Sequence, residues 1–192
     1  MSLSERDLRV IWHPYTQMQT AQPPIGIVRG EGTCVFDEDG KSYIDAVSSW
    51  WVNIHGHSHP YIAQKVAEQL LKLEHVIFAG FTHPGAVELA ERLLAILPDD
   101  QKKAFYSDNG STAIEVAIKM CLQYWHNQGQ QRTKILAFKN AYHGDTFGAM
   151  SVSGRSAFTA AFDSLLFEVE FIDLPNDDNI ENLKSKISNL ES

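Results

Sequence analysis

The fold is decided by residues 104–138, which read AFYSDNGSTAIEVAIKMCLQYWHNQGQQRTKILAF. Residues 104–106 predict a short buried strand, and residues 114–125 carry apolar side chains at helical spacing. Residues 134–138 predict a second strand and residues 167–172 a third. Strands that alternate with helices in this way are typical of an α/β fold with a parallel sheet.

The turn between the first strand and the helix, residues 107–112, is the strongest candidate for a binding site. N–H groups at a helix N-terminus have no partner within the helix and attract anions. Gly110 lets the backbone come close to a ligand, and the hydroxyls of Ser111 and Thr112 can donate hydrogen bonds. This outlines a phosphate site, but an ordinary helix cap at Asp108 or Ser111 explains the same residues.

A second loop, residues 140–146, follows the strand that ends at Phe138. The carboxyl ends of parallel strands meet at one edge of a sheet, so this loop and the turn at 107–112 are expected to converge. The ring of Tyr142 could cover a planar cofactor, and Asp145 could orient polar groups. An ordinary turn in which Asp145 caps the next helix accounts for the pattern equally well.

The remaining segments predict a β-hairpin and further helices. Asp39-Gly40 separates the strand formers of residues 27–36 from those of residues 42–45. Apolar residues at helical spacing predict helices over residues 60–73, 82–97 and 179–190. We place a domain boundary between residues 80 and 81.

Composition excludes several classes of function. The 192 residues carry 16 Lys and Arg against 24 Asp and Glu, so the net charge is 16 − 24 = −8. No basic field favours nucleic acid or an anionic membrane surface. There is no apolar run long enough for a membrane helix and no signal sequence, so we expect a cytoplasmic protein.

Metal binding is not expected either. Cys34 and Cys121 lie far apart and form no zinc-finger pattern. His55, His57 and His59 alternate in a loop with no companion cysteine and no HExxH motif. We interpret these histidines as hydrogen-bonding loop residues.

The adjacent aromatic residues Trp50 and Trp51 follow the hairpin, and one small core does not easily bury both. One of them could line a pocket. The alternative places one in a core and the other at an interface.

Six motifs occur in the order found in the class III pyridoxal-phosphate aminotransferases. They are HPYT (13–16), SSWW (48–51), GHSHP (56–60), Gly110-Ser111, MCLQYW (120–125) and YHGDTFGAMS (142–151). The sequence thus resembles that family from about Trp12 to Ser153. Its HPYT and SSWW runs resemble those of a narrower group within the family. The members of this group transfer an amino group from S-adenosyl-methionine to 8-amino-7-oxononanoate in biotin biosynthesis.

The resemblance implies the N-terminal part of the aspartate-aminotransferase-like architecture, fold type I, in an enzyme that binds pyridoxal 5'-phosphate and is a homodimer. Residues 1–80 would contribute to the small domain and the substrate pocket, and residues 81–192 would form the first part of the cofactor-binding domain. The implied cofactor residues are Gly110, Ser111, Tyr142 and Asp145, and the implied substrate residues are Tyr15, Trp50 and Trp51.

One part of the family's chemistry has no counterpart in this sequence. Aminotransferases need a lysine that forms a Schiff base with the cofactor, and none of the ten lysines lies in a matching context. We therefore expect no catalytic residue among residues 1–192 and an inactive fragment. Two alternatives stay open: a class III enzyme for ornithine, 4-aminobutyrate or ω-amino acids, which the Trp50-Trp51 pair argues against, and a non-catalytic phosphate-binding or assembly module.

Overall fold

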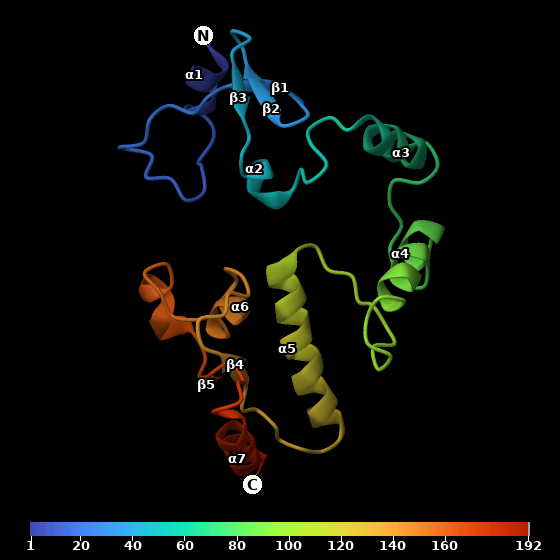
Figure 1. Ribbon diagram of the computed structural model, residues 1–192, viewed down its shortest axis with the longest axis vertical. Coiled ribbons are helices and arrows are strands. Elements are labelled where there is room, and N and C mark those ends of the chain that lie inside the picture. Colours follow the sequence, from blue (N-terminus) through green and yellow to red (C-terminus); the bar gives the residue numbers. More distant parts are fainter. Residues whose placement is uncertain (192) are drawn as a thin grey trace. The chain divides into compact units, whose positions relative to one another are not determined.

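The computed structural model describes residues 1–191, which pack as two compact units. Unit 1 covers residues 1–88 and unit 2 begins at residue 89, within helix α4 (Pro84–Leu94). Figure 1 labels the elements along the chain. Each unit is described by itself.

Unit 1 is built around a three-stranded antiparallel sheet in the order β1-β2-β3. Its strands are β1 (Ile27–Glu31), β2 (Cys34–Asp37) and β3 (Ser42–Ile44). The expected hairpin between β2 and β3 is confirmed, with Val35 opposite Tyr43. The run before it folds back once more, because Gly32 at φ 56° makes a tight turn between β1 and β2.

Three helices accompany this sheet in unit 1: α1 (Leu3–Asp7), α2 (Ser48–Trp51) and α3 (Pro60–Leu70). Helix α3 confirms the prediction from apolar periodicity. It begins with Pro60 at its first position, where the missing N–H has no helical partner to lose.

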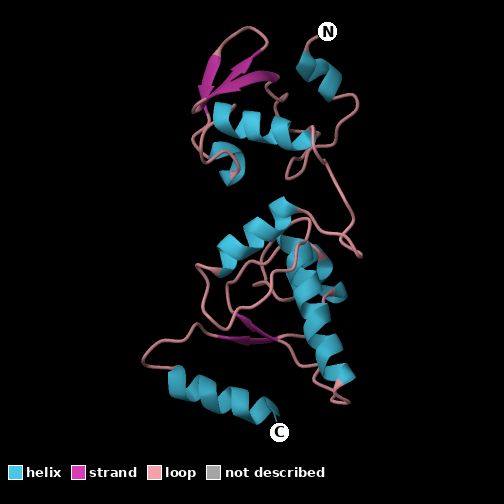
Figure 2. Ribbon diagram, turned by 90° about the vertical axis from the view of Figure 1, so that its right-hand side faces the viewer, coloured by secondary structure: helices cyan, strands magenta, loops and turns pink. Residues whose placement is uncertain are grey.

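Unit 2 alternates helices with strands. Its elements are α5 (Gly110–Asn127), β4 (Leu136–Phe138), α6 (Phe147–Ser151), the 3-10 helix η1 (Ala160–Leu165), β5 (Glu170–Ile172) and α7 (Ile180–Glu191). Strands β4 and β5 pair in parallel, with Ala137 opposite Phe171. Figure 2 shows this pair as the two strands of the lower unit. The parallel α/β prediction is therefore confirmed.

The strand predicted at residues 104–106 is wrong. The structure assigns no strand there, and Phe105 is 67% exposed. A strand exists only when a neighbour pairs with it, and residues 1–191 supply no neighbour for this segment. Strand-forming side chains alone could not reveal that.

The buried core of unit 2 lies around α6 and the parallel pair. Among residues 1–188, whose side chains are described, the buried apolar ones are Ala137, Ala149, Met150, Val152, Ile172 and Leu183. Helix α6 is buried from Gly148 to Ser151. No helix in the described part of the chain has both the length and the apolar character needed to cross a bilayer.

Candidate functional site

The N-terminus of α5 is capped by Asn109, whose backbone is extended. Its side-chain Oδ1 accepts the N–H of Thr112 at 3.0 Å, and the Thr112 hydroxyl accepts the N–H of Asn109 at 3.2 Å. The same hydroxyl lies 2.7 Å from the Ser107 Oγ. The cap is therefore made by Asn109 and not by Asp108 or Ser111. The N–H and the hydroxyl of Thr112 are both used in this cap.

The two residues after the cap, Gly110 and Ser111, have backbone N–H groups that are available to a ligand. Within residues 1–191, the N–H groups of Gly110 and Ser111 donate to no acceptor. A Cβ placed on Gly110 would meet no protein atom within 4 Å. Open space thus lies beside an uncapped pair of N–H groups at the positive end of an 18-residue helix, an arrangement suited to an anion.

The loop after β4 comes directly against this helix start. A Cβ on Gly144 would collide with Ser111 Oγ, and Gly144 has a φ of 130°. Only glycine satisfies both conditions. The N–H of Asp145 donates to Ser111 Oγ at 3.2 Å, so the two loops expected to converge do meet.

This contact prepares the Ser111 hydroxyl to act as a donor. The Asp145 N–H fills one of the lone pairs of Ser111 Oγ, which leaves the hydroxyl hydrogen available to an incoming anion. Together with the N–H groups of Gly110 and Ser111, this hydroxyl gives the helix start three donors. We call Gly110, Ser111 and the Asp145 N–H the anion cradle.

Tyr142 and Asp145 stand together beside the cradle. The Tyr142 hydroxyl donates to Asp145 Oδ2 at 2.9 Å, and the tyrosine side chain is 72% exposed. The bond fixes the ring relative to the loop, and most of the side chain is accessible to solvent. All four residues implied for the cofactor are thus brought together in unit 2.

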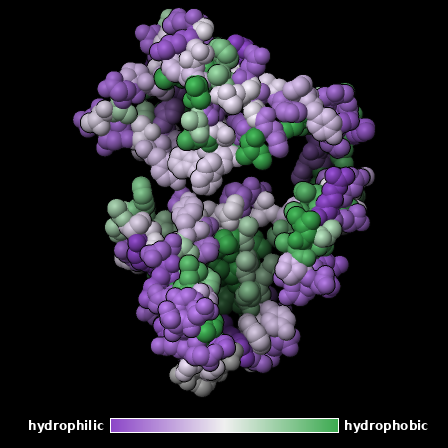
Figure 3. All heavy atoms as spheres, in the orientation of Figure 1, coloured by the Kyte–Doolittle hydropathy of each residue, from purple (hydrophilic) through white to green (hydrophobic). Residues whose placement is uncertain are grey.

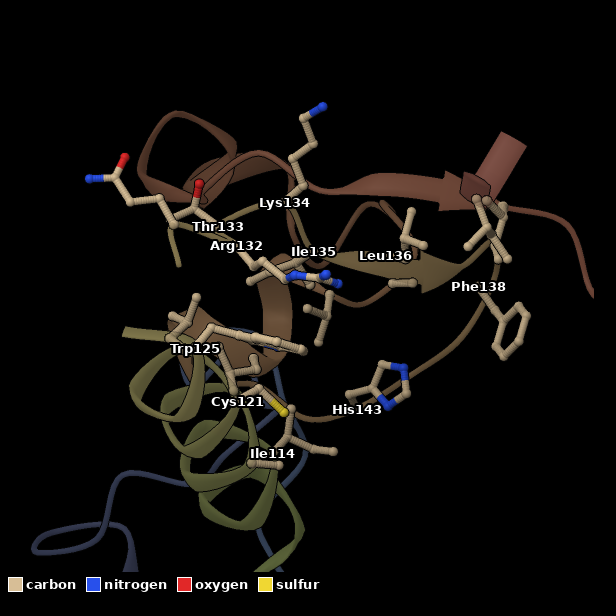
Figure 4. Close-up of a pocket in the computed structure, with 18 residues that line it drawn as sticks. Ile114, Cys121, Trp125, Arg132, Thr133, Lys134, Ile135, Leu136, Phe138 and His143 are labelled. Carbon is tan, nitrogen blue, oxygen red and sulfur yellow. The ribbon is translucent and has the colours of Figure 1, made fainter. Parts of the chain in front are cut away.

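His143, another polar residue of this loop, lines a cavity of about 860 Å³ between α5 and β4 (Figure 4). Ile114, Cys121 and Trp125 of α5 line its other side. Figure 3 shows hydrophobic side chains gathered over α5 in this region. None of the cradle residues lines the cavity, so it is an apolar space separate from the cradle.

Glu115, a residue that the sequence did not single out, holds α6 in place. Its Oε1 accepts the N–H groups of Gly148 at 2.7 Å and Ala149 at 3.2 Å. The nearby Thr146 hydroxyl, followed by these N–H groups, lowers the pKa of Glu115 below its usual value, although this buried hydroxyl makes no hydrogen bond of ordinary geometry. No sequence signal could have found this contact, because its partners lie more than 30 residues further along the chain.

The residues implied for the substrate pocket lie in unit 1. The rings of Tyr15 and Trp50 stack, with centroids 5.7 Å apart and an angle of 26° between their planes. Trp50 is 70% exposed and Trp51 79%, so neither tryptophan lies in a core. Two of the three implied residues are therefore in contact, on an accessible surface of this unit.

Both tryptophans lie in a left-handed turn. Ser48, Ser49, Trp50 and Trp51 have φ values of 48°, 47°, 66° and 70°. For residues other than glycine this conformation costs about 1–2 kcal/mol each, and it rarely extends beyond one residue. Such strain persists only where surrounding contacts impose it, and it is concentrated at functional sites.

Asp45 supplies such contacts from the end of β3. Its Oδ2 accepts the Ser49 hydroxyl at 2.7 Å and lies 2.9 Å from His57 Nε2. The Ser49 N–H, then the Ser49 hydroxyl and then His57, lower the pKa of Asp45 from 3.8 to about 2. The interpretation of the histidine loop as hydrogen-bonding residues is confirmed at His57.

Among residues 1–188, whose side chains the structure describes, no group of three or more His, Cys, Asp or Glu side chains could hold a metal ion. Of the lysines near the cradle loops, Lys139 lies 3.0 Å from Asp173 and its side chain is 52% exposed, and Lys119 is exposed on α5.

Comparison with known proteins extends the resemblance beyond the motifs. The family "Aminotransferase class-III" matches residues 15–192, so the match continues past Ser153. A relative from Synechococcus elongatus, named adenosylmethionine-8-amino-7-oxononanoate aminotransferase, is 55% identical over 86% of this chain and 39% of its own length. One of the same name from Geobacter sulfurreducens is 45% identical over 86% of this chain and 37% of its own.

Solved structures agree in fold. That of adenosylmethionine-8-amino-7-oxononanoate aminotransferase from Methanocaldococcus jannaschii has a TM-score of 0.85 and 41% identity, covering 98% of this chain and 43% of that one. An omega transaminase from Pseudomonas jessenii in complex with PMP has a TM-score of 0.82 and 30% identity, covering 92% and 40%. The chain spans about two fifths of the length of these proteins. With the family match over residues 15–192, these likenesses establish that the chain belongs to the class III aminotransferases.

Proposed function

We propose that this chain provides the phosphate cradle and part of the substrate pocket of a pyridoxal-phosphate-dependent aminotransferase. The observation that carries the proposal is the contact between Asp145 N–H and Ser111 Oγ, which joins the two loops at the open N-terminus of α5. A phosphate dianion requires N–H and O–H donors, and the cradle offers three. The residues therefore fit this cofactor.

Each residue has a distinct task in this proposal. Gly110 and Ser111 bind the phosphate, and Tyr142 covers one face of the pyridine ring. Asp145 orients the Tyr142 ring through the bond to its hydroxyl. When bound, the cofactor would supply an electron sink and would carry the amino group from donor to acceptor. This chain's own contribution is to hold and orient it.

For the substrates, we propose S-adenosyl-methionine as the amino donor and 8-amino-7-oxononanoate as the acceptor, giving 7,8-diaminononanoate in biotin biosynthesis. The names of the relatives at 55% and 45% identity support this choice over other class III substrates. Tyr15, Trp50 and Trp51 offer apolar walls that suit a long aliphatic substrate. An assay of the whole enzyme with S-adenosyl-methionine against ornithine as donor decides between the two; activity with ornithine alone contradicts the choice.

We further propose that the whole enzyme is a cytoplasmic homodimer and that residues 1–192 alone do not catalyse transamination. None of their ten lysines lies in the context that the reaction needs. If the cofactor-loaded chain is reduced with borohydride and digested, mass spectrometry should find no specifically labelled lysine. A single lysine labelled in high yield contradicts this part of the proposal.

The cradle itself is tested by Gly110→Ala. The added Cβ meets no atom of another segment, so the variant should not lower the thermal midpoint, but in this proposal it enters the space that the phosphate would occupy. We expect the dissociation constant for pyridoxal phosphate, measured by calorimetric titration, to rise about tenfold or more, which is about 1.4 kcal/mol.

The matched control is Gly85→Ala, where the added Cβ meets only the His83 ring at 3.6 Å, an ordinary contact. Its affinity for pyridoxal phosphate should equal that of the unmodified chain. Equal affinities for Gly110→Ala and Gly85→Ala would count against the cradle.

A further inference from the structure

Backbone hydrogen bonds close the turn at Ser48–Trp51, but they do not explain why the turn is left-handed. The N–H of Trp51 donates to Val47 O at 2.9 Å, and the N–H groups of Val52 and Asn53 donate to Ser48 O at 2.9 and 3.1 Å. A right-handed turn could make similar bonds without strain. Contacts from outside the turn must therefore select the left-handed form.

Asp45 makes those contacts from the residue just beyond β3. Its carboxylate reaches forward to the hydroxyl of Ser49, the second residue of the turn, at 2.7 Å. The same Oδ2 atom lies 2.9 Å from His57 Nε2. The side chains of Asp45 and His57 are 11% and 16% exposed, so water competes little for these bonds.

Both residues are fixed to the tight turn between β1 and β2. The N–H of Asp45 donates to Thr33 O at 2.9 Å. His57 and Gly32 exchange two backbone bonds, of 2.8 and 3.2 Å. A Cβ on Gly30 would lie 2.7 Å from His57 Cβ, so the imidazole is packed directly on the strand. The carboxylate therefore has a rigid base.

His57 can play this part in one tautomer. The Asn53 side-chain amide lies 3.4 Å from Nδ1, and an amide nitrogen can only donate. Nδ1 is then the acceptor, and Nε2 carries the hydrogen that is donated to Asp45. Asn53 thus orients the ring from the residues that close the turn.

We propose that Asp45 is a positioning residue that, braced by His57, holds the Ser48–Trp51 turn in its left-handed form and so sets the Trp50 ring against Tyr15. The link to substrate binding rests on the function proposed above. The brace itself does not, because it is defined by contacts within unit 1. No cofactor or substrate is needed to test it.

The test compares Asp45→Asn with the unmodified chain in two measurements. We expect hydrogen exchange at the amides of residues 51–53 to become about tenfold faster or more, because a bond to a charged acceptor is lost. The near-ultraviolet circular dichroism of the Tyr15–Trp50 stack, defined as the signal that Trp50→Phe removes, should fall by more than about half. Unchanged exchange and an unchanged signal would overturn the proposal.

Asp37→Asn, in strand β2 of the same unit, is the matched control. Asp37 accepts the Tyr43 hydroxyl at 2.7 Å and the N–H groups of Asp39 and Lys41, but it does not touch the left-handed turn. It should leave both signals unchanged. If Asp37→Asn accelerates exchange at residues 51–53 as much as Asp45→Asn does, Asp45 acts only through the general stability of unit 1 and the proposal fails.

A rescue experiment separates positioning from simple loss of structure. Glycine adopts positive φ without the penalty of a Cβ, so Ser49→Gly in the Asp45→Asn background should restore much of the Tyr15–Trp50 signal. Ser49→Ala in the same background should not. Should Asp45→Asn fail to fold, Ser49→Ala alone removes the 2.7 Å contact and must itself weaken the signal. Equal signals for the glycine and alanine variants would overturn the proposal.

Discussion

At the scale of single residues, the bonding of Asp45 gives it a distinctive response to acid. Its pKa is lowered from 3.8 to about 2 by the Ser49 N–H, the Ser49 hydroxyl and His57. In the unfolded chain these partners are lost and the carboxyl takes up a proton at higher pH. The stabilisation from Asp45 is therefore complete above about pH 4 and disappears as the pH falls through about 2.

We expect this dependence to appear as a difference between the unmodified chain and Asp45→Asn. The unmodified chain should have the higher urea midpoint at about pH 5, and the difference should shrink by about pH 2.5, since the variant has no carboxyl to protonate. Urea unfolding followed by circular dichroism at both pH values measures it. A difference that stays constant between the two would contradict the assigned bonding.

The residues of the cradle show how far sequence reasoning extends at this scale. That Gly110 and Ser111 bind a phosphate remains a proposal, but their place at the start of α5 was predictable, because a glycine and a hydroxyl just before an apolar run at helical spacing mark a helix start in the local sequence. The role of Gly144 was not, since it depends on the approach of Ser111 from another loop. The cap was assigned to the wrong residue because Asp108, Asn109 and Ser111 are all good capping residues, and only the backbone conformation selects Asn109.

At the scale of elements, α6 depends on a neighbouring helix for its start. It has five residues, and its N-cap Thr146 makes no side-chain capping bond to the backbone. Glu115 of α5 accepts the N–H groups of Gly148 and Ala149 instead. A carboxylate is well suited to this position, because the N-terminus of a helix carries partial positive charge.

Removing this acceptor should loosen α6. We expect Glu115→Ala to lower stability by about 1–2 kcal/mol, in the range for the loss of a helix cap, and to speed hydrogen exchange at residues 148–150. Glu115→Gln keeps an acceptor oxygen and should lose less. Thermal unfolding and exchange mass spectrometry measure both variants. Equal losses for Gln and Ala would show that the acceptor oxygen does not matter.

Elements were predictable where the determinants are local. Helices α3, α5 and α7 follow from apolar periodicity, and the β2–β3 hairpin follows from Asp39-Gly40. The strand at residues 104–106 was wrong because pairing is a property of two segments. The left-handed α2 was not predicted, because its four residues all disfavour that conformation by themselves and Asp45 selects it from outside.

At the scale of the whole molecule, much apolar surface stays in contact with water. Among residues 1–191, Leu71 is 90% exposed and Trp12 87%. The cavity beside α5 is lined largely by apolar side chains such as Ile114, Leu122 and Ile135. A net charge of −8 counteracts aggregation by mutual repulsion.

The cavity beside α5 has a practical consequence for anyone who handles this chain. Dyes such as anilinonaphthalene sulfonate fluoresce when they enter apolar surface, and their binding is commonly taken as the mark of a molten globule. For this protein we expect the folded chain to give strong dye fluorescence at room temperature. The fluorescence should decrease on heating, because the cavity is lost when α5 and β4 separate. Weak dye fluorescence at room temperature that increases on heating would contradict this prediction. In a melting curve followed with such a dye, the fluorescence of this protein should therefore fall on unfolding, where it rises for most proteins. The high initial signal is not evidence of misfolding.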